Sequence, residues 1–504
     1  ATKGVDVRTE TEATGIDRAA KTVTLRHLPT GREEVLVYDK LVLAMGSTPV
    51  SLPVPGAQLQ GIHAVHDLDA AQRIRALVSG GGVTRAVVVG AGFIGLEMAV
   101  ALADMWGVMT TVVEFRDQIL PGVIGGNLAR MAQKQMEEKG VVFRLGEQVR
   151  AFEGGGGDGG SESDRVARVL TDKAVLEADL VIVAIGVRPN SALAREAGLA
   201  VSERGGIKVD EQLRTSDPDI FAGGDCVELK NLITDSPTYL PLGSLANRQG
   251  RVIGTNLAAG TNLAGDASTF AGAVGSWCVK LFDLSAAGTG LTLQAAKAAG
   301  YDALNVHVSQ LDRAHFYPDK GLMSLELVAE RGTGRVLGMQ GLAVMGDALV
   351  GKVDVVAALL PTGLTVETLS GLELAYSPPF AAALDILNVL GNATENILAG
   401  RNRGIHVDEF ATLWAARNDQ GDYILDCRER ANVTELLSAH PEHWHNIPQG
   451  ELRGRLDEIP RDARVVLICN TGARSYEAFI TLAHAGFKDV VSVEGGMTAV
   501  LAAG

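Results

Sequence analysis

The sequence predicts an α/β protein with several domains. Its 504 residues correspond to three or four domains of about 150 residues each. A strand, a glycine turn, a helix and a second strand follow one another over residues 87–114, which is the pattern of a parallel βαβ unit. A second apolar strand, residues 465–468, leads into a cysteine-containing loop and a helix. Together with 60 glycines for tight turns, these features favour parallel sheets covered by helices.

The composition excludes several classes of function. Asp and Glu (60) outnumber Lys and Arg (45), and the net charge of −15 argues against nucleic acid or an anionic membrane as the main partner. No run of about eighteen apolar residues occurs, so we expect no transmembrane helix. Four cysteines are too few for a disulfide framework, which predicts a reducing, cytoplasmic location.

The N-terminal stretch predicts strands and turns. Residues 23–25 and 35–38 alternate around a turn at 29–31 and predict a hairpin. Residues 41–44 predict a buried strand, and residues 68–78 predict a helix that ends at a run of glycines.

The rest of the chain predicts further strands, a separate α+β domain and a final α/β unit. The glycine-rich run 154–160 is expected to link two strands, with a phosphate-binding role as the alternative. The expected segments are strands at 181–185 and 220–222, an α+β domain over 270–390 with strands at 303–308 and 322–329 and a helix at 347–360, and strands of the final unit at 423–425 and 465–468.

The strongest motif is Gly90-Ala91-Gly92-Phe93-Ile94-Gly95, between a strand and a helix. Gly90 permits the tight turn, Gly92 lets a pyrophosphate approach the backbone, and Gly95 lets the helix pack closely on the strand. The helix N-terminus then offers N–H groups to the phosphates. Glu114 ends the next strand about 20 residues further on, where an acid binds the ribose hydroxyls. A glycine turn without a ligand is the alternative interpretation.

Arg116 bears on the choice between NADH and NADPH. Its guanidinium is close enough in sequence to reach a 2′-phosphate, and the alternative is a solvated loop residue. Glu114 carries negative charge where that phosphate would lie, so we expect NADH to be preferred.

The second motif is the loop from Cys469 to Ser475, which follows a buried strand and precedes a helix. A cysteine at a helix N-terminus is stabilised as thiolate or persulfide by N–H dipoles, and Arg474 adds positive charge. The loop's small neutral side chains leave room for a substrate of the size of a sulfur atom. The alternative is a buried structural cysteine.

The other cysteines and histidines indicate no metal site. Cys226, Cys278 and Cys427 do not form a Cys-x-x-Cys pair, so neither a zinc site nor a dithiol motif is expected. The histidines at 440, 443 and 445 have metal-like spacing, but Pro441 and the lack of a fourth ligand favour a surface turn.

The order of the N-terminal motifs resembles the flavin-dependent pyridine nucleotide–disulfide oxidoreductases. It is carried by Leu43–Pro49, the Gly90 motif, and Thr215–Asp225 with its continuation Leu240–Gly250. In that family the stretch that ends in Gly-Asp closes the FAD site. The resemblance therefore implies that Asp225 binds the ribitol chain, and it implies further cofactor contacts from Gly46, Gly186 and Ala246.

The last hundred residues are similar to a rhodanese domain. Asp426-Cys427-Arg428, His445–Pro448 and Gly495-Gly496 stand in family order around Cys469. The resemblance implies that Cys469 carries sulfane sulfur and that Arg474 and the loop N–H groups stabilise its charge.

Leu374–Phe380 is similar to the dimerisation domain of coenzyme A disulfide reductases. With the rhodanese resemblance, this narrows the family to coenzyme A disulfide reductases and NADH-dependent persulfide reductases. In these relatives two tyrosines of the dimer partner line the sulfur-substrate site, and Tyr317 and Tyr376 occupy the matching positions.

Two departures from the family pattern affect the expected chemistry. The family begins with a glycine fingerprint for FAD and a redox cysteine, and neither precedes Met45 here. We expect the 504-residue chain alone to bind FAD weakly and to reduce no disulfide, while sulfur transfer at Cys469 persists. Leu384 stands where the family carries a lysine near a coenzyme A phosphate, so coenzyme A disulfide is expected to be a poor substrate.

The resemblance implies an α/β flavoprotein fold with two dinucleotide-binding domains, the first incomplete, an α+β dimerisation domain and a C-terminal rhodanese-like α/β domain. The expected domains are the first part of the FAD-binding domain (1–70), the NAD(P)H-binding domain (71–192), the second part of the FAD-binding domain (193–268), the dimerisation domain (269–400) and the rhodanese domain (401–504).

The expected function is an oxidoreductase that uses FAD and NADH, with NADPH as the alternative and coenzyme A as a further ligand. It would act as a homodimer on a small persulfide, polysulfide or disulfide. Two other functions remain open. One is a sulfurtransferase with a catalytically silent flavoprotein scaffold, and the other is a non-enzymatic redox sensor or sulfur carrier.

Overall fold

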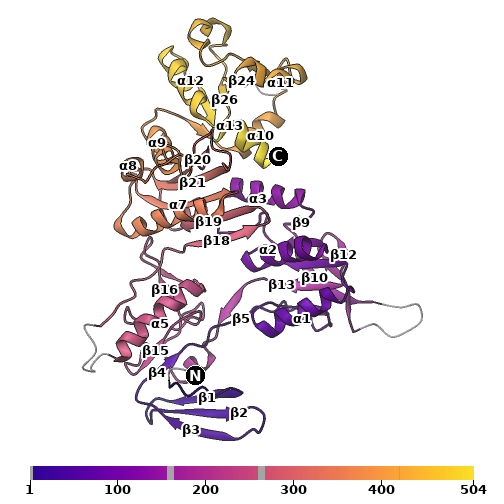
Figure 1. Ribbon diagram of the computed structural model, residues 1–504, viewed down its shortest axis with the longest axis vertical. Coiled ribbons are helices and arrows are strands. Elements are labelled where there is room, and N and C mark those ends of the chain that lie inside the picture. The colour runs from indigo at the N-terminus through magenta and orange to yellow at the C-terminus, as the bar shows by residue number, and fades with distance from the viewer. Residues whose placement is uncertain (1–3, 156–163, 259–266, 419–420) are drawn as a thin grey trace. The chain divides into compact units, whose positions relative to one another are not determined.

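The computed structural model describes residues 4–155, 164–258, 267–418 and 421–504 (Figure 1). The chain divides into two compact units, Ala1–Ser51 with Gly186–Gly275, and Leu52–Ile185 with Ser276–Gly504. Most of the predicted glycine-rich loop, from Gly156 onward, lies outside the described residues. In the described part of the chain, no helix is long and apolar enough to cross a bilayer.

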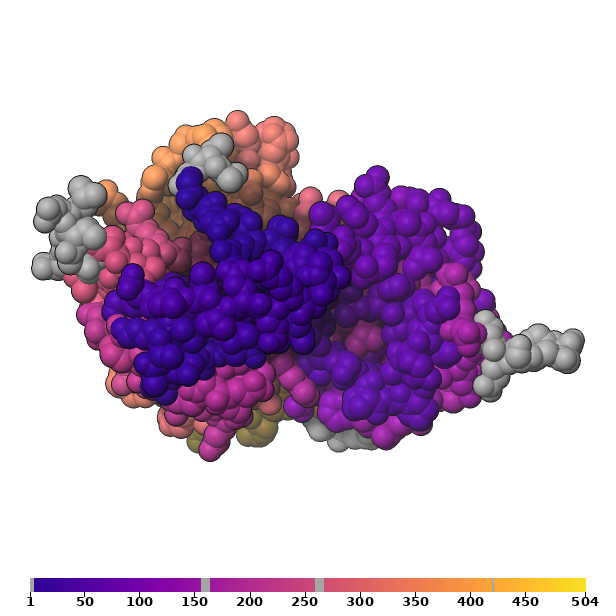
Figure 2. Space-filling view, turned by 90° about the horizontal axis from the view of Figure 1, so that it is seen from below, coloured from indigo at the N-terminus to yellow at the C-terminus, as the bar shows by residue number. Residues whose placement is uncertain are grey.

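The first unit begins with an antiparallel sheet, which confirms the predicted hairpin. Its strands are β1 (Thr11–Asp17), β2 (Thr22–His27) and β3 (Glu33–Val37), and Thr24 pairs with Val35. All of β3 is exposed, and Figure 2 shows the indigo N-terminal segment open at the surface. The predicted buried strand, β4 (Leu41–Leu43), is buried only at Leu43. Its neighbour on one side is β15 (Ile220–Ala222), and no second strand is paired with it among the described residues.

Short elements complete this unit around a core to which Leu43, Ile220 and Leu245 contribute. They are β5 (Ser47–Pro49) paired with β14 (Val187–Pro189), β16 (Leu229–Lys230) paired with β17 (Pro237–Thr238), α4 (Ala192–Glu196) and α5 (Gly243–Ala258).

The second unit starts with a five-stranded parallel sheet, which confirms the predicted βαβ unit. Its central strands are apolar because helices and a small antiparallel sheet cover its two faces. The strand order is β6 (Ile62–His63), β13 (Leu180–Val183), β7 (Arg85–Val89), β8 (Met109–Glu114) and β9 (Val142–Leu145). The other elements are α1 (Leu68–Ser79), α2 (Phe93–Val100), the π-helical turn η1 (Ala101–Met105), α3 (Gly126–Glu138), β10 (Val149–Gly154), β11 (Val166–Thr171) and β12 (Val175–Glu177).

A five-stranded antiparallel sheet follows and confirms the predicted α+β domain. Long strands with both faces buried form its centre. The strand order is β18 (Trp277–Leu281), β19 (Leu284–Gly290), β22 (Val336–Ala343), β21 (Leu322–Glu330) and β20 (Ala303–Leu311). The helices are α6 (Leu293–Ala298), α7 (Gly346–Leu359), η2 (Leu360–Thr362), α8 (Val366–Ser370) and α9 (Ile386–Leu398).

The C-terminal part is a five-stranded parallel sheet with a hydrophobic core on each face. The strand order is β23 (Gly404–Ile405), β27 (Val490–Val493), β26 (Val465–Ile468), β24 (Tyr423–Asp426) and β25 (Trp444–Asn446). The helices are α10 (Val407–Ala415), η3 (Arg430–Asn432), α11 (Thr434–Ala439), η4 (Leu452–Gly454), η5 (Leu456–Glu458), α12 (Ala473–His484) and α13 (Gly496–Ala503).

This C-terminal part packs on the rest of the second unit. Helix α13 contacts α3, and the Lys134 ammonium donates to the Leu501 carbonyl (2.6 Å). The Glu494 carboxylate, just after β27, accepts the His307 N–H of β20 (2.7 Å), and helix α13 also contacts β20.

Candidate functional site

Each glycine of the Gly90 motif has its own steric environment. A Cβ at Gly90 (φ 104°) would lie 2.4 Å from the Ala184 carbonyl oxygen, and one at Gly95 would lie 1.9 Å from the Gly90 oxygen. A Cβ at Gly92 would meet nothing within 4 Å. Close packing therefore requires glycine at 90 and 95, whereas the space beside Gly92 is open at the N-terminus of α2. An approaching pyrophosphate fits this space.

Glu114 lies at the carboxyl end of β8 and is tied to the glycine turn. Its carboxylate is buried and accepts N–H groups from Ala91 and Arg116, each at 2.8 Å. This fixes the acid beside the turn, where a ribose would follow the pyrophosphate. The guanidinium of Arg116 is exposed over the Phe115 ring. These residues fit NADH, which supplies hydride when bound.

The first unit brings three of the predicted flavin contacts together. Asp225 accepts the Ser47 hydroxyl (3.0 Å), so it lies next to Gly46. A Cβ at Gly224 would contact the Cβ of Ala246 (3.8 Å). Gly46 (φ 65°) has open space where a Cβ would be, and so does Gly186 at the start of β14.

Tyr239 adds a second buried polar group to this region. Its hydroxyl oxygen makes no hydrogen bond of good geometry, and the Ser47 hydroxyl that donates to Asp225 is its polar neighbour. Burial, reinforced by the charge of Asp225, raises the pKa of Tyr239 to about 12, so the hydroxyl stays protonated and can donate. An acceptor at Asp225, a donor at Tyr239 and open backbone at Gly46 fit the polar chain of a flavin.

The Cys469 loop forms the sulfur-binding geometry at the end of β26. The Cys469 side chain is buried, its Sγ accepts the Gly472 N–H (3.1 Å), and the Ser475 hydroxyl lies 3.5 Å from it. Gly472 is the N-cap of α12 in the left-handed conformation (φ 109°), which glycine adopts without strain. The Gly472 N–H, at the N-terminus of α12, therefore points at the sulfur. Arg474 is half-buried on that turn.

The start of α13 holds the loop from the other side. Met497 N–H donates to the Cys469 carbonyl (2.8 Å), and Thr498 N–H donates to that of Asn470 (3.0 Å). A Cβ at Gly496 would lie 2.4 Å from the Cys469 oxygen, so only glycine allows this approach.

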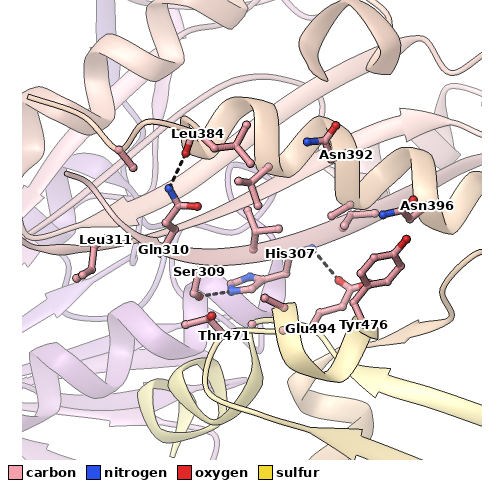
Figure 3. A pocket seen from close by; sticks show the side chains of 18 of the residues that line it. His307, Ser309, Gln310, Leu311, Leu384, Asn392, Asn396, Thr471, Tyr476 and Glu494 are labelled. Carbon is pink, nitrogen blue, oxygen red and sulfur yellow. Dashed lines mark hydrogen bonds between the residues drawn. The ribbon is translucent and has the colours of Figure 1, made fainter. Parts of the chain in front are cut away.

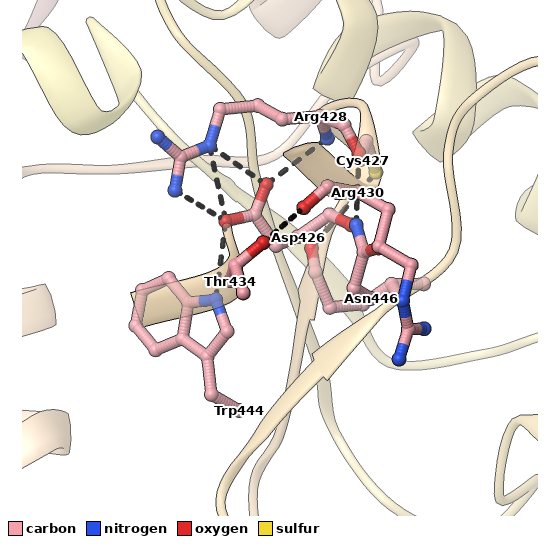
Figure 4. Close-up of polar contacts among 8 residues, drawn as sticks. Asp426, Cys427, Arg428, Arg430, Thr434, Trp444 and Asn446 are labelled. Carbon is pink, nitrogen blue, oxygen red and sulfur yellow. Dashed lines mark hydrogen bonds and ion pairs between the residues drawn. The ribbon is translucent and has the colours of Figure 1, made fainter. Parts of the chain in front are cut away.

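A buried ion pair fixes the neighbouring strand end (Figure 4). The Asp426 carboxylate accepts from the backbone and the guanidinium of Arg428, and from the Trp444 indole N–H (3.1 Å). Asn446 donates to the carbonyls of Asp426 and Arg428, each at 2.8 Å. Every partner of this carboxylate is buried, so the backbone on both sides of Cys427 is held firmly.

A cavity of about 740 Å³ opens between the Cys469 loop and the antiparallel domain (Figure 3). Thr471, Gly472 and Ala473 of the loop line one side. Tyr376 and Leu384 line the opposite side, with amides of Gln310, Asn392 and Asn396 and the apolar side chains of Val308, Leu311 and Val389. The structure thus brings Tyr376 to the loop, whereas Tyr317 is not among the lining residues, although its neighbours His315 and Phe316 are.

A buried cluster of charged residues beside this cavity was missed from the sequence. Glu494, at the end of β27, accepts the His307 N–H (2.7 Å) and lies 3.3 Å from His406 Nδ1. His307 Nδ1 in turn lies 3.6 Å from Glu326. No sequence pattern joins these four residues, because the contacts link strands and turns that are far apart in the chain.

The pKa values in this cluster move in both directions. Burial raises the pKa of Glu494. Burial lowers the pKa of His406, but the charges of Glu494 and Glu326 outweigh it and raise that pKa above its ordinary value. Burial also acts to raise the pKa of Glu326, but His307 and His406 outweigh it and lower that pKa.

Cys226, Cys278 and the predicted histidine cluster lie in different environments. Cys226 is buried in the core of the first unit, and Cys278 is exposed on the edge strand β18. His440 contacts Trp414 edge-on, and His445 stacks on Tyr423 at 4.0 Å. Within the described ranges, no group of three or more His, Cys, Asp or Glu side chains could hold a metal ion.

Family models match three parts of the chain. Residues 1–250 match the model described as pyridine nucleotide-disulphide oxidoreductase, residues 277–387 match the dimerisation domain of that family, and residues 409–503 match a rhodanese-like domain. The chain belongs to the pyridine nucleotide-disulphide oxidoreductases, which use FAD and NAD(P)H. It is therefore an NAD(P)H-dependent oxidoreductase, and the family, fold class and enzyme class predicted from the sequence are confirmed.

Three known proteins illustrate the likeness. The NAD-dependent persulfide reductase from A. fulgidus is 39% identical, with a TM-score of 0.89 over 99% of this chain and 86% of that chain. The NAD(P)H coenzyme A polysulfide/persulfide reductase of Pyrococcus horikoshii is 31% identical over 388 residues, which are 77% of this chain and 82% of that protein. An NADH oxidase of Methanocaldococcus jannaschii is 33% identical over 399 residues, 77% of this chain and 84% of that protein.

Proposed function

We propose that this protein uses NADH to reduce the sulfane sulfur of a persulfide or polysulfide, and that its rhodanese domain carries such sulfur on Cys469. The relatives named as persulfide reductases support this reaction. The observation that carries it is the cavity that joins the Cys469 loop to Tyr376 and Leu384, because one carrier molecule in that space touches both domains. An NADH oxidase acting on oxygen needs no such loop.

The chain's own residues divide the work. The Gly92 turn and Glu114 hold the dinucleotide, and Asp225, Tyr239 and Gly46 bind the polar chain of the flavin. A bound flavin supplies hydride acceptance and two-electron reduction of sulfur. In the rhodanese domain, the Gly472 N–H and the Ser475 hydroxyl stabilise charge on the sulfur of Cys469, and Arg474 adds positive charge. The match to a dimerisation domain supports a homodimer.

The carrier is a small thiol of mainly neutral chemistry. Most of the cavity lining consists of amides and apolar side chains, together with His307, His315 and Glu494, and the Arg313 guanidinium on the lining is already paired with Asp312 (2.8 Å). Leu384 supplies no cation for a phosphate. Small persulfides and polysulfide are therefore the proposed substrates ahead of coenzyme A disulfide.

The location in the cell is a separate point. The four unpaired cysteines support a reducing, cytoplasmic location.

Cys469→Ser tests the role of the rhodanese domain. Serine forms no persulfide, so sulfur transfer from thiosulfate to cyanide is expected to be lost, while NADH binding is unchanged because the glycine turn is remote from the loop in sequence and contacts. Thiocyanate formation and NADH fluorescence report the two properties. Cys278→Ser, on the exposed edge strand, is the matched control. Transfer that persists in the Cys469 variant would remove Cys469 from the proposal.

A further inference from the structure

Two cysteines occupy neighbouring positions on adjacent parallel strands of the rhodanese domain. In the register of β24 and β26, Leu425 pairs with Leu467 and Asp426 with Ile468. The next residues are Cys427 and Cys469, and the ladder continues because Cys427 N–H donates to the Ile468 carbonyl (2.8 Å). Adjacent strands lie about 4.7–4.9 Å apart, which is within the Cα separation of about 4.4–6.8 Å that a disulfide bridges.

Both side chains point to the same face of the sheet. Cys427 and Cys469 share one hydrophobic core with Leu425 and Leu467. The intervening residues, among them Ile468, belong to the core on the opposite face. Strand alternation therefore places the two sulfur atoms side by side, and both side chains are buried.

Electrostatics give the two thiols different properties. Burial, with the neighbouring charges of Cys469 and Asp426, raises the pKa of the Cys427 thiol far above its ordinary value, and Arg474 only partly opposes this. Cys427 therefore keeps its proton, while the Cys469 sulfur has the Gly472 N–H to stabilise negative charge. A proton donor thus lies next to the proposed persulfide.

We propose that Cys427 is a resolving cysteine that releases the sulfur carried by Cys469 as hydrosulfide. This inference rests on the proposed persulfide at Cys469. The Cys427 proton first passes to the terminal sulfur of the persulfide. The Cys427 thiolate so formed then bonds to the Cys469 sulfur, and the bond between the two sulfur atoms of the persulfide breaks as HS⁻ leaves. The persulfide anion and the thiol thus become a disulfide and HS⁻. The sulfane sulfur gains two electrons, which the two cysteine sulfurs lose, and two external thiol groups later reduce the disulfide.

The fixed backbone around Cys427 favours the formation of this disulfide. Asp426 and Arg428, on either side of it, are held by Trp444 and Asn446 (Figure 4). Cys427 therefore stays beside the end of β26, where its N–H donates to the Ile468 carbonyl. Burial also keeps bulky oxidants and bulky thiols in solution from Cys427, so small thiols are the ones that reduce the disulfide. A sulfur species already on Cys469 is therefore its natural reaction partner. The competing interpretation is that Cys427 only fills core volume, as a small apolar side chain does.

A single-turnover experiment separates the two interpretations. The full-length protein is reduced, freed of small thiols and mixed with thiosulfate, which gives one sulfite for each persulfide formed on Cys469. Sulfite and sulfide are then measured with no thiol added, and non-reduced peptides are analysed by mass spectrometry. We expect sulfide to follow sulfite in equal amount, with a peptide pair joined through Cys427 and Cys469.

Cys427→Ala and Cys427→Val are expected to keep the sulfite burst, to release at least tenfold less sulfide, and to retain one extra sulfur atom on Cys469. The sulfite burst shows that both variants are folded, and Cys278→Ser is expected to behave as the wild type. A wild-type sulfite burst followed by a stable persulfide, or sulfide release that persists in both Cys427 variants, would overturn the inference. If the wild type gives no sulfite burst at all, the proposed function of Cys469 fails instead.

Discussion

The two glycines at the N-terminus of α2 give a sharp test of the dinucleotide site. A methyl group at Gly95 would lie 1.9 Å from a carbonyl oxygen, whereas one at Gly92 would meet no protein atom within 4 Å. Gly92 has φ −78° and ψ −172°, which alanine adopts without strain. We therefore expect Gly95→Ala to impair folding and Gly92→Ala to impair ligand binding alone.

The magnitudes follow from these contacts. Overpacking at Gly95 costs about 1–3 kcal/mol, which lowers the melting temperature by several degrees. Alanine at position 92 allows fewer conformations in the unfolded state than glycine does, which stabilises the folded state by about 0.4–1 kcal/mol. Alanine is also a poorer N-cap than glycine, which offsets this gain, so the free energy of unfolding stays near that of the wild type. A methyl group that displaces the pyrophosphate removes a charge-assisted hydrogen bond of about 1.5–3 kcal/mol, which is roughly ten- to a hundredfold in the dissociation constant.

Thermal unfolding and NADH fluorescence titration measure both effects on the same samples. Gly82→Ala, at an exposed glycine with open surroundings just before β7, is the matched control and is expected to change neither property. If Gly92→Ala binds NADH as tightly as the wild type, the pyrophosphate does not approach this backbone. If Gly95→Ala keeps the wild-type melting temperature, the packing argument for that glycine is wrong.

Three further predictions concern cofactor choice, substrate choice and pH. Glu114→Gln is expected to lower the ratio of the NADPH dissociation constant to the NADH dissociation constant about tenfold, since it removes like-charge repulsion of about 1.4 kcal/mol. If that ratio stays the same in Glu114→Gln and changes in Arg116→Ala instead, Arg116 decides the cofactor choice. Leu384→Lys is expected to improve kcat/KM for coenzyme A disulfide about tenfold or more while a small persulfide is unaffected, because Leu384 lies on the cavity wall and is half exposed; equal rates in both proteins would contradict this. Because the folded state raises the pKa of His406 above 6.5, its stabilising charge is fully present below that pH and is lost as the pH rises through the raised value. The melting temperature should therefore fall on the alkaline side of 6.5, less so in His406→Gln, and it should also fall below about 4.5, where Glu326 with its lowered pKa becomes protonated; a pH profile that is identical in wild type and His406→Gln would refute the first part.

Local signals in the sequence predicted most of the fold. The strands around the Gly90 motif are continuous apolar runs because helices and a second sheet cover both faces of their sheet. Such a run can be recognised in the sequence without knowing which elements pack against it. The exposure of Val42 was not predictable, because burial of β4 depends on which strand lies beside it. The π-helical turn at Ala101–Met105 also leaves no mark in the sequence that separates it from an α-helix.

The site was predictable where its parts are close in sequence. The contacts of the Cys469 sulfur with the Gly472 N–H and the Ser475 hydroxyl lie within one loop, so the residue order was enough to predict a candidate site there. Contacts between residues far apart in the sequence could not be predicted. The His307–Glu494 bond joins β20 to the end of β27, and a glycine at Gly495 lets the His307 ring approach to within 3 Å of where a Cβ would be. Only the packed structure brings these groups together.

The arrangement around Cys469 separates recognition of the carrier from the chemistry of the sulfur. Thr471, Gly472 and Ala473 face the cavity, while Cys469 itself is only 1% exposed behind them. On the proposed function, a carrier in the cavity contacts the loop, and Cys469 lies behind these three residues. The same shielding protects a persulfide on Cys469 from bulky thiols in solution. On the proposed function, that leaves two ways for the sulfur to leave: to a carrier seated in the cavity, or to Cys427 on the adjacent strand, within the core.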